Sequence, residues 1–212
     1  MHVIIFSDVH GNLPALELML KNEKQADLFI SLGDIVNYAP WSNECVQLLE
    51  TIPNIVKLKG NHEDAYIKGI YNGSHIVAKS FFNICFPSFS ELENISNYKN
   101  DYALQGFKFI HTIDDSYIFA DTNIALKEHT VLGHSHKQFV TEKGGFMLIN
   151  PGSIGQNRSF INVSDYIVWN TVTNTFTCKH NIYNIDFIIN EMHIRNYPQI
   201  CIDYYQNKKR YE

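Results

Sequence analysis

The chain has 212 residues, of which 45% are hydrophobic and 18% are charged, and its formal net charge is −5. This is the composition of a globular protein long enough to bury a core, and the acidic balance argues against a protein that binds the nucleic-acid backbone, which needs a basic face. A small phosphorylated substrate is not excluded, because bound divalent metals would reverse the local charge.

The first third of the chain alternates short apolar runs with amphipathic segments. The predicted buried strands span residues 2–7, 28–32 and 55–58, because each is a continuous apolar run. Helices are predicted over residues 14–24, where Pro14 suits the first turn, and over residues 43–50. Strand, loop and helix in succession imply right-handed crossovers and a largely parallel sheet.

The remainder of the chain is predicted to be rich in strands. An aromatic-rich stretch at residues 80–93 is expected to be helical and to be split by Pro87. Two closing helices are expected at residues 185–195 and 198–205. The predicted strands, two pairs of which are hairpins, span residues 102–104, 107–111, 130–132, 139–141, 146–149, 166–170 and 175–179. Since there is no repeat or linker, we expect one α/β domain over residues 1–212.

The cysteines and the apolar stretches favour a cytoplasmic protein. No two of the four cysteines form a C-x-x-C pair, so neither a zinc knuckle nor a redox motif is indicated. The apolar stretch at the N-terminus is too short for a signal peptide, and no stretch approaches the roughly 20 residues that span a bilayer. We expect a soluble chain with no membrane partner, and the composition leaves a homo-oligomer open.

Four short segments place metal-ligand residue types directly after apolar runs. The segments are Asp8-Val9-His10, Gly33-Asp34, Gly60-Asn61-His62-Glu63 and Gly133-His134-Ser135-His136, and His111 lies between the last two. Side chains that follow strands of an α/β sheet can converge in the crevice beyond the carboxyl ends. Together the segments offer three carboxylate or amide oxygens and four imidazoles, with one histidine to spare. That set suffices for two metal ions, an arrangement suited to attack on phosphorus.

Each segment taken alone has a plain alternative. The first two are also typical of solvated turns, Asn61-His62 of a helix cap, and His111 of a core histidine. Their joint occurrence after apolar strands, in one order, outweighs these alternatives. The other five histidines do not belong to such segments and are expected to be structural or exposed; they are His2, His75, His129, His180 and His193.

The ordered segments resemble those of the calcineurin-like metallophosphoesterases. Residues 32–45 and 149–156 are similar to two further blocks of the compact bacterial and archaeal phosphodiesterase-type members. The resemblance implies an α/β fold, a four-layer αββα sandwich of two mixed sheets with a dimetal site at the carboxyl ends of the strands. It also implies a hydrolase of phosphodiester or nucleotide-type phosphate esters, in which a hydroxide that bridges two metals attacks phosphorus.

The resemblance implies a role for each candidate residue. The implied ligands are Asp8, His10 and His136 for one metal, Asn61, His111 and His134 for the other, and Asp34 for both. His62 would stay unliganded and donate a proton to the leaving oxygen, with an orienting role as the alternative. Manganese is the expected ion, and iron, zinc or nickel would suit the same ligand types.

The chain departs from parts of the family pattern. Thr112 follows His111, where the family often has glycine. The arginines of the protein serine/threonine phosphatase branch are missing, both after Asp34 and before Gly60. The candidates for substrate binding are Tyr38, which together with Trp41 could stack on a ring, and Arg158, which could bind phosphate. Packing beneath the entrance and an exposed surface position are the respective alternatives.

Other functions stay open. A diadenosine tetraphosphate-type pyrophosphohydrolase or a phosphomonoesterase would use the same site. A catalytically silent scaffold of the same fold is disfavoured because all seven implied ligands and His62 are present. A repair nuclease is disfavoured by the short, acidic chain. The loops at residues 36–43, 66–90 and 112–127 are expected to select the substrate, and their aromatic residues favour a nucleotide-like small molecule.

Overall fold

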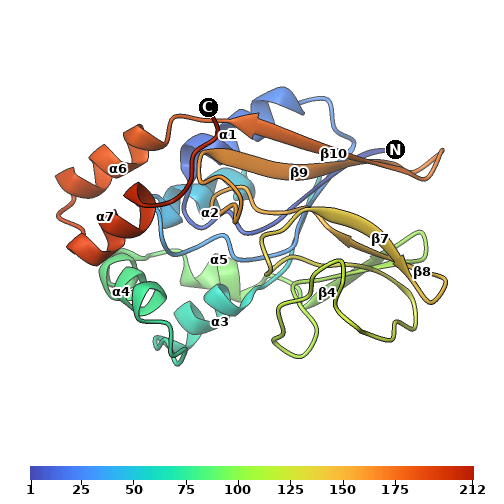
Figure 1. Ribbon diagram of the computed structural model, residues 1–212, viewed down its shortest axis with the longest axis horizontal. Coiled ribbons are helices and arrows are strands. Elements are labelled where there is room, and N and C mark those ends of the chain that lie inside the picture. The colour runs from blue at the N-terminus through green and yellow to red at the C-terminus, as the bar shows by residue number, and fades with distance from the viewer.

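Ten strands form two five-stranded sheets in the computed structural model, which describes residues 1–212 (Figure 1). The strands of the first sheet are β1 (His2–Phe6), β2 (Leu28–Ser31), β3 (Ile55–Lys57), β9 (Val163–Asn170) and β10 (Thr175–Ile182). The strands of the second sheet are β4 (Asp101–Leu104), β5 (Phe107–Ile110), β6 (His129–Val131), β7 (Phe139–Lys143) and β8 (Phe146–Asn150). Their orders are β10-β9-β1-β2-β3 and β4-β5-β6-β8-β7.

Both sheets are mixed. In the first sheet β1, β2 and β3 pair in parallel, whereas β9 runs antiparallel to both β1 and β10. In the second sheet β5, β6 and β8 are parallel, and the edge strands β4 and β7 are antiparallel to their neighbours. The predicted α/β class with two mixed sheets is confirmed, as is the parallel pairing of the first three strands.

A continuous apolar layer lies between the two sheets. Val3 and Ile5 of β1 point into this layer, whereas Ile4 and Phe6 point to the opposite face, because successive side chains of a strand alternate. Within the layer the ring of Phe109 lies 6.1 Å from that of Trp169, centre to centre. A strand that is buried on both faces has no polar side, which explains the unbroken apolar runs in the sequence.

Seven α-helices accompany the sheets, and most of them gather around the first sheet (Figure 1). They are α1 (Leu13–Asn22), α2 (Ser42–Glu50), α3 (Asn61–Lys68), α4 (Ile76–Cys85), α5 (Leu92–Ser96), α6 (Ile185–Ile194) and α7 (Gln199–Gln206). Buried side chains of α1, α2, α4, α6 and α7 join the outer face of the first sheet in the largest apolar cluster of the molecule. None of the helices is long and apolar enough to cross a membrane.

The outer face of the second sheet is covered without a helix. Residues 112–128 connect β5 to β6 and contain neither a helix nor one of the ten strands. From this segment Ile118 packs against Leu132 and Leu148 in a small buried cluster. The fourth layer of the predicted sandwich is therefore an irregular segment in this chain. Tyr117 and Phe119 of the same segment also lie beside the candidate ligands.

The predicted elements appear near their predicted positions, with one omission. The aromatic-rich stretch is split as expected, since α4 ends at Cys85, a single 3₁₀ turn follows at Phe86–Ser88, and α5 begins at Leu92. Helix α3 was not predicted. It has only eight residues and buries His62, Glu63 and Tyr66, so it lacks the apolar stripe that reveals an amphipathic helix.

Truncation of Phe109 tests the layer between the sheets. The side chain is 0% exposed, so Phe109→Ala is expected to lower the free energy of unfolding by about 3–5 kcal/mol, from lost burial and an unfilled cavity. Urea unfolding followed by circular dichroism measures the change. Val172, which is 85% exposed, is the control, and Val172→Ala should change stability by less than about 0.5 kcal/mol. Similar small losses in both variants would contradict a packed layer between the sheets.

Candidate metal centre

The candidate ligands lie on loops that leave the carboxyl ends of the strands. Asp8 follows β1, Asp34 follows β2 and Asn61 follows β3, while His111 and His134 follow β5 and β6. Since β1 to β3 are parallel to one another, and β5 and β6 likewise, each sheet delivers its loops to a single edge. Backbone hydrogen bonds tie the first two loops together, from the N–H of Asp8 to the oxygen of Gly33 at 3.0 Å and from that of His10 to the oxygen of Asp34 at 3.0 Å.

These loops hold five candidate ligands in the left-handed region of backbone conformation. The φ angles are +55° at Asp8, +50° at His10, +54° at Asp34, +65° at His134 and +56° at His136. Asp8 and His10 converge as predicted, and they do so through these turns, because β1 ends at Phe6. A non-glycine residue in this region costs about 1–3 kcal/mol and persists where the surrounding contacts over-determine it, which is common at functional sites.

Two glycines allow the loops after β2 and β3 to touch. A Cβ atom on Gly60 would lie 2.2 Å from Oδ1 of Asp34, and one on Gly33 would lie 2.4 Å from the backbone nitrogen of Gly60. Gly33 also has a φ of +104°, which side chains rarely tolerate. The glycines of both segments are therefore required by a close backbone contact that positions Asp34.

Glu63 is a functional residue to which the sequence patterns assigned no role. Its buried carboxylate accepts hydrogen bonds from the backbone N–H groups of Asp34, Ile35 and Val36 at 2.7, 2.7 and 3.2 Å, and from that of Gly60 at 2.7 Å. Burial raises the pKa of Glu63 to about 7, and the N–H donors act in the opposite direction. This carboxylate clamps the loop that carries Asp34 to the start of α3.

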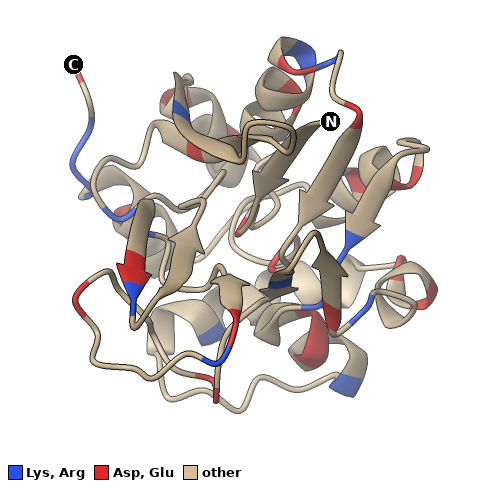
Figure 2. Cartoon of the chain, turned by 90° about the vertical axis from the view of Figure 1, so that its right-hand side faces the viewer, with Lys and Arg blue, Asp and Glu red and all other residues tan.

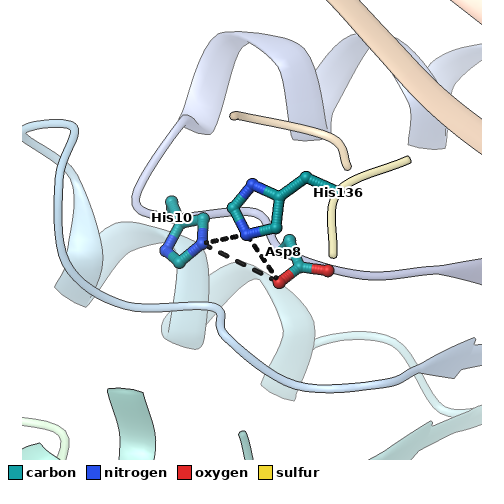
Figure 3. Close-up of side chains that lie close together, drawn as sticks. All are labelled: Asp8, His10 and His136. Atoms are coloured by element: carbon teal, nitrogen blue, oxygen red, sulfur yellow. Dashed lines mark hydrogen bonds and ion pairs between the residues drawn. The ribbon is translucent and has the colours of Figure 1, made fainter. Parts of the chain in front are cut away.

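The first candidate cluster consists of Asp8, His10 and His136 (Figure 3). Nε2 of His136 lies 3.2 Å from Oδ1 of Asp8 and 3.3 Å from Nε2 of His10. Nδ1 of His136 lies 2.8 Å from the oxygen of Gln156, and Nδ1 of His10 lies 3.2 Å from that of Val36. Because a carbonyl oxygen only accepts, both Nδ1 atoms carry the proton in the neutral rings, and both Nε2 atoms present lone pairs.

The second candidate cluster gathers around His111. Its Nε2 lies 3.1 Å from Oδ1 of Asn61, 3.3 Å from Oδ2 of Asp34 and 3.3 Å from Nδ1 of His134. Its Nδ1 lies 2.9 Å from the oxygen of Leu32, so in the neutral ring Nε2 again presents a lone pair. Asp34 also lies 3.9 Å from Nε2 of His10, and it is therefore the residue that both clusters share.

The two clusters fit divalent metal ions. Each brings carboxylate oxygens and imidazole lone pairs within 4.8 Å of one another, and every histidine and aspartate involved is buried. Oδ1 of Asp8 is buried without a hydrogen-bond donor. Electron-pair acceptors packed in this way repel one another unless a cation lies between them. Imidazole nitrogen with carboxylate oxygen is a ligand set that suits first-row transition metals.

The pKa shifts at the clusters reflect close contacts between buried carboxylates and histidines. Burial alone would raise the pKa of Asp8 and Asp34, yet His136 and His111 respectively hold both carboxyl groups well below their usual range. Burial would lower the pKa of His111, but Asp34 raises it to about 10. Burial and the neighbouring His111 lower the pKa of His134 to about 4.

His62 lies against both clusters, because a ring nitrogen of it and ligand atoms of His10 and Asp34 all lie within 4.8 Å of one another. It is buried, and its ring centre lies 4.9 Å from that of His10. Nδ2 of Asn37 lies 3.1 Å from its Nδ1 and 3.4 Å from the oxygen of Ala78, which only accepts. The amide therefore donates to Nδ1, and the proton of a neutral His62 lies on Nε2. Burial lowers the pKa of His62, although the Asp34 carboxylate opposes the shift.

Asn37 is a second residue that the sequence patterns missed. Asn37 lies three positions after Asp34, within residues 32–45, which are similar to a block of the family. It has a φ of +75°, and its side chain is buried. An asparagine that tolerates the left-handed region was the available signal. Its contact with His62, which lies 25 residues further along the chain, is decided by tertiary structure.

A cavity of about 560 Å³ opens over the clusters. Besides candidate ligands and His62, its lining contains aromatic and basic side chains from six parts of the chain, namely Tyr38, Tyr71, His75, Tyr117, Phe119, Lys137, Arg158 and Tyr204. The three loops that were expected to select the substrate all contribute to this lining, and α7 and the segment after β8 contribute as well.

The three candidates for substrate contact have different positions. Tyr38 lines the cavity, with its ring centre 4.7 Å from that of His10. Arg158 also lines it, with Cζ 5.7 Å from the centre of the Tyr117 ring. Trp41 is buried away from the lining and stacks on Phe187 of α6 at 5.6 Å, so packing accounts for it and the predicted ring-stacking role is wrong.

The remaining histidines lie outside the two clusters. His129 begins β6 as predicted, and its Nδ1 accepts a hydrogen bond from the N–H of Met147 at 2.9 Å. His75 caps α4, where its Nδ1 accepts from the N–H of Ala78, and it reaches the rim of the cavity. His2, His180 and His193 are not part of the cavity lining. His180 and His193 are exposed and His2 begins β1, so the expectation that these five residues are structural or exposed is confirmed.

Substitution of Glu63 by glutamine tests the clamp on the Asp34 loop. The amide of Glu63→Gln would place an N–H₂ group against backbone N–H donors, so stability is expected to fall by about 3 kcal/mol. Urea unfolding in the presence of chelator measures this loss without a contribution from bound metal. Asp64→Asn is the matched control, because Asp64 is the next residue of α3 and is exposed, and it should change stability by less than about 1 kcal/mol. Equal effects would show that Glu63 is not a clamp.

Comparisons with known proteins agree with the fold and with the ordered segments. The family model of the calcineurin-like phosphoesterase superfamily domain matches residues 1–173. An uncharacterized protein of Methanocaldococcus jannaschii is 28% identical in an alignment 207 positions long, which covers 79% of this chain and 82% of that protein.

Solved structures share the architecture over nearly the whole chain. A metallophosphoesterase from Sphaerobacter thermophilus is 25% identical with a TM-score of 0.77, covering 97% of this chain and 99% of that one. A hypothetical protein from Pyrococcus horikoshii has the same fold, with a TM-score of 0.78 at 13% identity, covering 96% of this chain and 97% of that one. The chain belongs to the calcineurin-like phosphoesterase superfamily.

Proposed function

We propose that this protein is a metal-dependent phosphoesterase that hydrolyses phosphodiesters or nucleotide-type phosphate esters. One observation carries the proposal: the Asp34 carboxylate lies between two buried clusters of lone-pair acceptors, 3.3 Å from His111 and 3.9 Å from His10, beneath an open cavity. Membership of a phosphoesterase family supports the reaction class.

The clusters would hold two divalent ions. The proposed ligands are Asp8, His10 and His136 for one ion, Asn61, His111 and His134 for the other, and Asp34 for both. When bound, the ions would lower the pKa of a water molecule and offset the charge of the phosphoryl oxygens. Manganese is the ion we propose, and the ligand types also suit iron, zinc and nickel.

The chain itself orients the proposed ligands. Three of the four imidazoles donate from Nδ1 to backbone oxygens, those of Val36, Leu32 and Gln156 at 3.2, 2.9 and 2.8 Å, which fixes each tautomer and the direction of each ring. The N–H of His62 donates to Oδ1 of Asp34 at 2.9 Å, which leaves Oδ2 to face the histidines. The groups are thus preorganised before any ion binds.

We propose that His62 donates a proton to the leaving oxygen. The side-chain amide of Asn37 donates to Nδ1 of His62, so the proton of the neutral ring is on Nε2. Burial lowers the pKa of His62 and the Asp34 carboxylate raises it, and a bound phosphate anion would raise it further, so that the ring can bind the proton that it then gives to the leaving oxygen. Tyr38 packs against both His10 and His62 and is proposed to line the position of the reacting phosphate.

The shape of the cavity favours a nucleotide-sized substrate. A volume of about 560 Å³ with four tyrosines in its wall suits a phosphate that carries a flat ring. A solved putative diadenosine tetraphosphatase and a solved archaeal phosphodiesterase share the fold at 18% identity, with TM-scores of 0.57 and 0.53. A scaffold role is not favoured, because none of the proposed ligand positions carries a side chain unable to bind metal.

Removal of the shared carboxylate tests the metal centre. Asp34→Asn is expected to lower the rate of hydrolysis of bis(p-nitrophenyl) phosphate by at least about 100-fold in the presence of Mn²⁺, because both ions lose a charged ligand. Metal analysis of the dialysed variant should show less bound metal than the wild type.

Asp121→Asn is the control for this experiment, since Asp121 is an exposed aspartate that does not line the cavity. Its rate and metal content should match those of the wild type. Wild-type protein that binds no transition metal and hydrolyses no phosphate ester would refute the proposed function.

Substitution of His62 tests the proton donor. With the phenyl ester of thymidine 5′-phosphate as substrate, His62→Ala is expected to lower kcat by about 10²–10⁴-fold, since phenolate is a poor leaving group that needs a proton. With the matching ester of 4-nitrophenol the loss should be much smaller. Steady-state kinetics on the two esters gives the comparison.

His193→Ala, which removes an exposed imidazole on α6, should leave both rates unchanged. An equal loss on the two esters would show that His62 positions the substrate and does not donate the proton.

A further inference from the structure

Arg158 is a cation without an acidic partner at the edge of the cavity. The other two arginines are paired, Arg195 with Glu191 and Arg210 with Asp186, each at 2.8 Å. Arg158 forms no ion pair within the molecule, although the chain carries a net charge of −5. Its Cζ atom lies 5.7 Å from the ring of Tyr117, which in turn stacks at 4.4 Å on His134. The guanidinium is therefore at most about 10 Å from a proposed metal ligand.

Two lysines reinforce this positive charge. Lys137 lines the same cavity, and its Nζ donates to Oγ of Ser159, the residue after Arg158, at 2.7 Å. Nζ of Lys208 lies 4.6 Å over the ring of Tyr204, which is another residue of the lining. Neither lysine has a carboxylate partner. Burial lowers the pKa of Lys208, and the charge of Arg158 lowers it further, so the two cations are near enough to repel each other.

The backbone holds these cations in place. Oδ1 of Asn157 accepts from the N–H groups of Ser159 and Phe160 at 2.8 and 3.1 Å, which closes a tight turn around Arg158. The C-terminal tail lies along the next residues, because the N–H of Ile161 donates to the oxygen of Lys209 at 2.9 Å. Figure 2 shows the basic tail as a blue segment beside the body of the molecule. Three cations are therefore kept close together against their mutual repulsion.

We infer that Arg158, with Lys137 and Lys208 beside it, binds a second, non-reacting phosphate group, so that the substrate is a nucleotide carrying two phosphates. This inference rests on the proposed function. The reacting phosphate would lie at the metal clusters, and the second phosphate would neutralise the unpaired cations through a two-pronged contact with the guanidinium. Tyr117 lies between the two positions, with its ring stacked on His134 and beneath the guanidinium of Arg158.

Part of this subsite lies outside the region that matches the family model. That region ends at residue 173, whereas Tyr204 and Lys208 belong to α7 and the tail that follows it. The C-terminal elements of this chain therefore supply one wall of the proposed subsite.

A matched pair of substrates tests the inference. The p-nitrophenyl ester of thymidine 5′-phosphate and the same ester with a 3′-phosphate share the reacting group and differ only in the second phosphate. The ratio of their kcat/KM values is expected to be about 10 or more in favour of the 3′-phosphorylated ester, and Arg158→Gln should bring it to about 1. Lys208→Gln should lower the ratio partially.

Lys24→Gln is the control, since it removes an exposed lysine that does not line the cavity and should keep the wild-type ratio. The p-nitrophenyl esters of adenosine 5′-phosphate and of adenosine 5′-diphosphate form a second arm, because they share the leaving group and only the latter has a non-reacting phosphate. A preference for the diphosphate ester that Arg158→Gln abolishes would place the second phosphate in an anhydride chain and not across a sugar. A ratio near 1 for wild type in both arms would overturn the inference.

Binding separates this inference from the proposed function. Calorimetry with metal-loaded protein compares thymidine 3′,5′-bisphosphate with thymidine 5′-monophosphate, and the bisphosphate is expected to bind about tenfold more tightly in wild type but equally in Arg158→Gln. Such binding without any hydrolysis would refute the proposed function and keep the subsite. Hydrolysis of both esters, with an equal rate loss in Arg158→Gln, would show that Arg158 acts on the reacting phosphate and would refute the subsite.

Discussion

The buried carboxylate of Asp34 is the point on which the candidate site depends. It lies at the end of β2 in the first sheet, yet its Oδ2 is 3.3 Å from His111, which follows β5 of the second sheet. Histidines from both sheets therefore face a single anion. The same charge raises the pKa of His111 and is held ionised by it. Residues more than 70 positions apart thus interact electrostatically at one place, and a bound cation would be favoured there.

Much of the surrounding structure serves to hold that carboxylate. Glu63 receives four backbone N–H groups around the Asp34 loop, and Gly60 leaves room for Oδ1 of Asp34 at a distance no side chain would allow. Left-handed residues on either side would be unfavourable in isolation, and the apolar layer between the sheets stabilises them by fixing where each strand ends. Stability of the fold and geometry of the site are consequently linked.

Patterns within the sequence predicted the parts that depend on local composition. Unbroken apolar runs marked β1 and β2 because both faces of these strands are buried, and Pro87 marked the break after α4. Helix α3 escaped prediction because its buried side is made of His62, Glu63 and Tyr66. For Trp41 the sequence left ring stacking and packing as alternatives, and packing holds, because its ring stacks on Phe187, a residue 146 positions away that the sequence could not pair with it.

The residue types and their order after each strand are readable in the sequence, and they sufficed to predict the superfamily, the two mixed sheets and the composition of the candidate metal clusters. Which atoms meet depends on the folded chain. The tautomers of the histidines depend on carbonyl oxygens of Leu32, Val36 and Gln156, and the charge beside the cavity depends on Arg158 having no acidic neighbour. The physical reason is that a lone pair or an unpaired charge is defined by what lies within a few ångströms, and those neighbours come from distant parts of the chain.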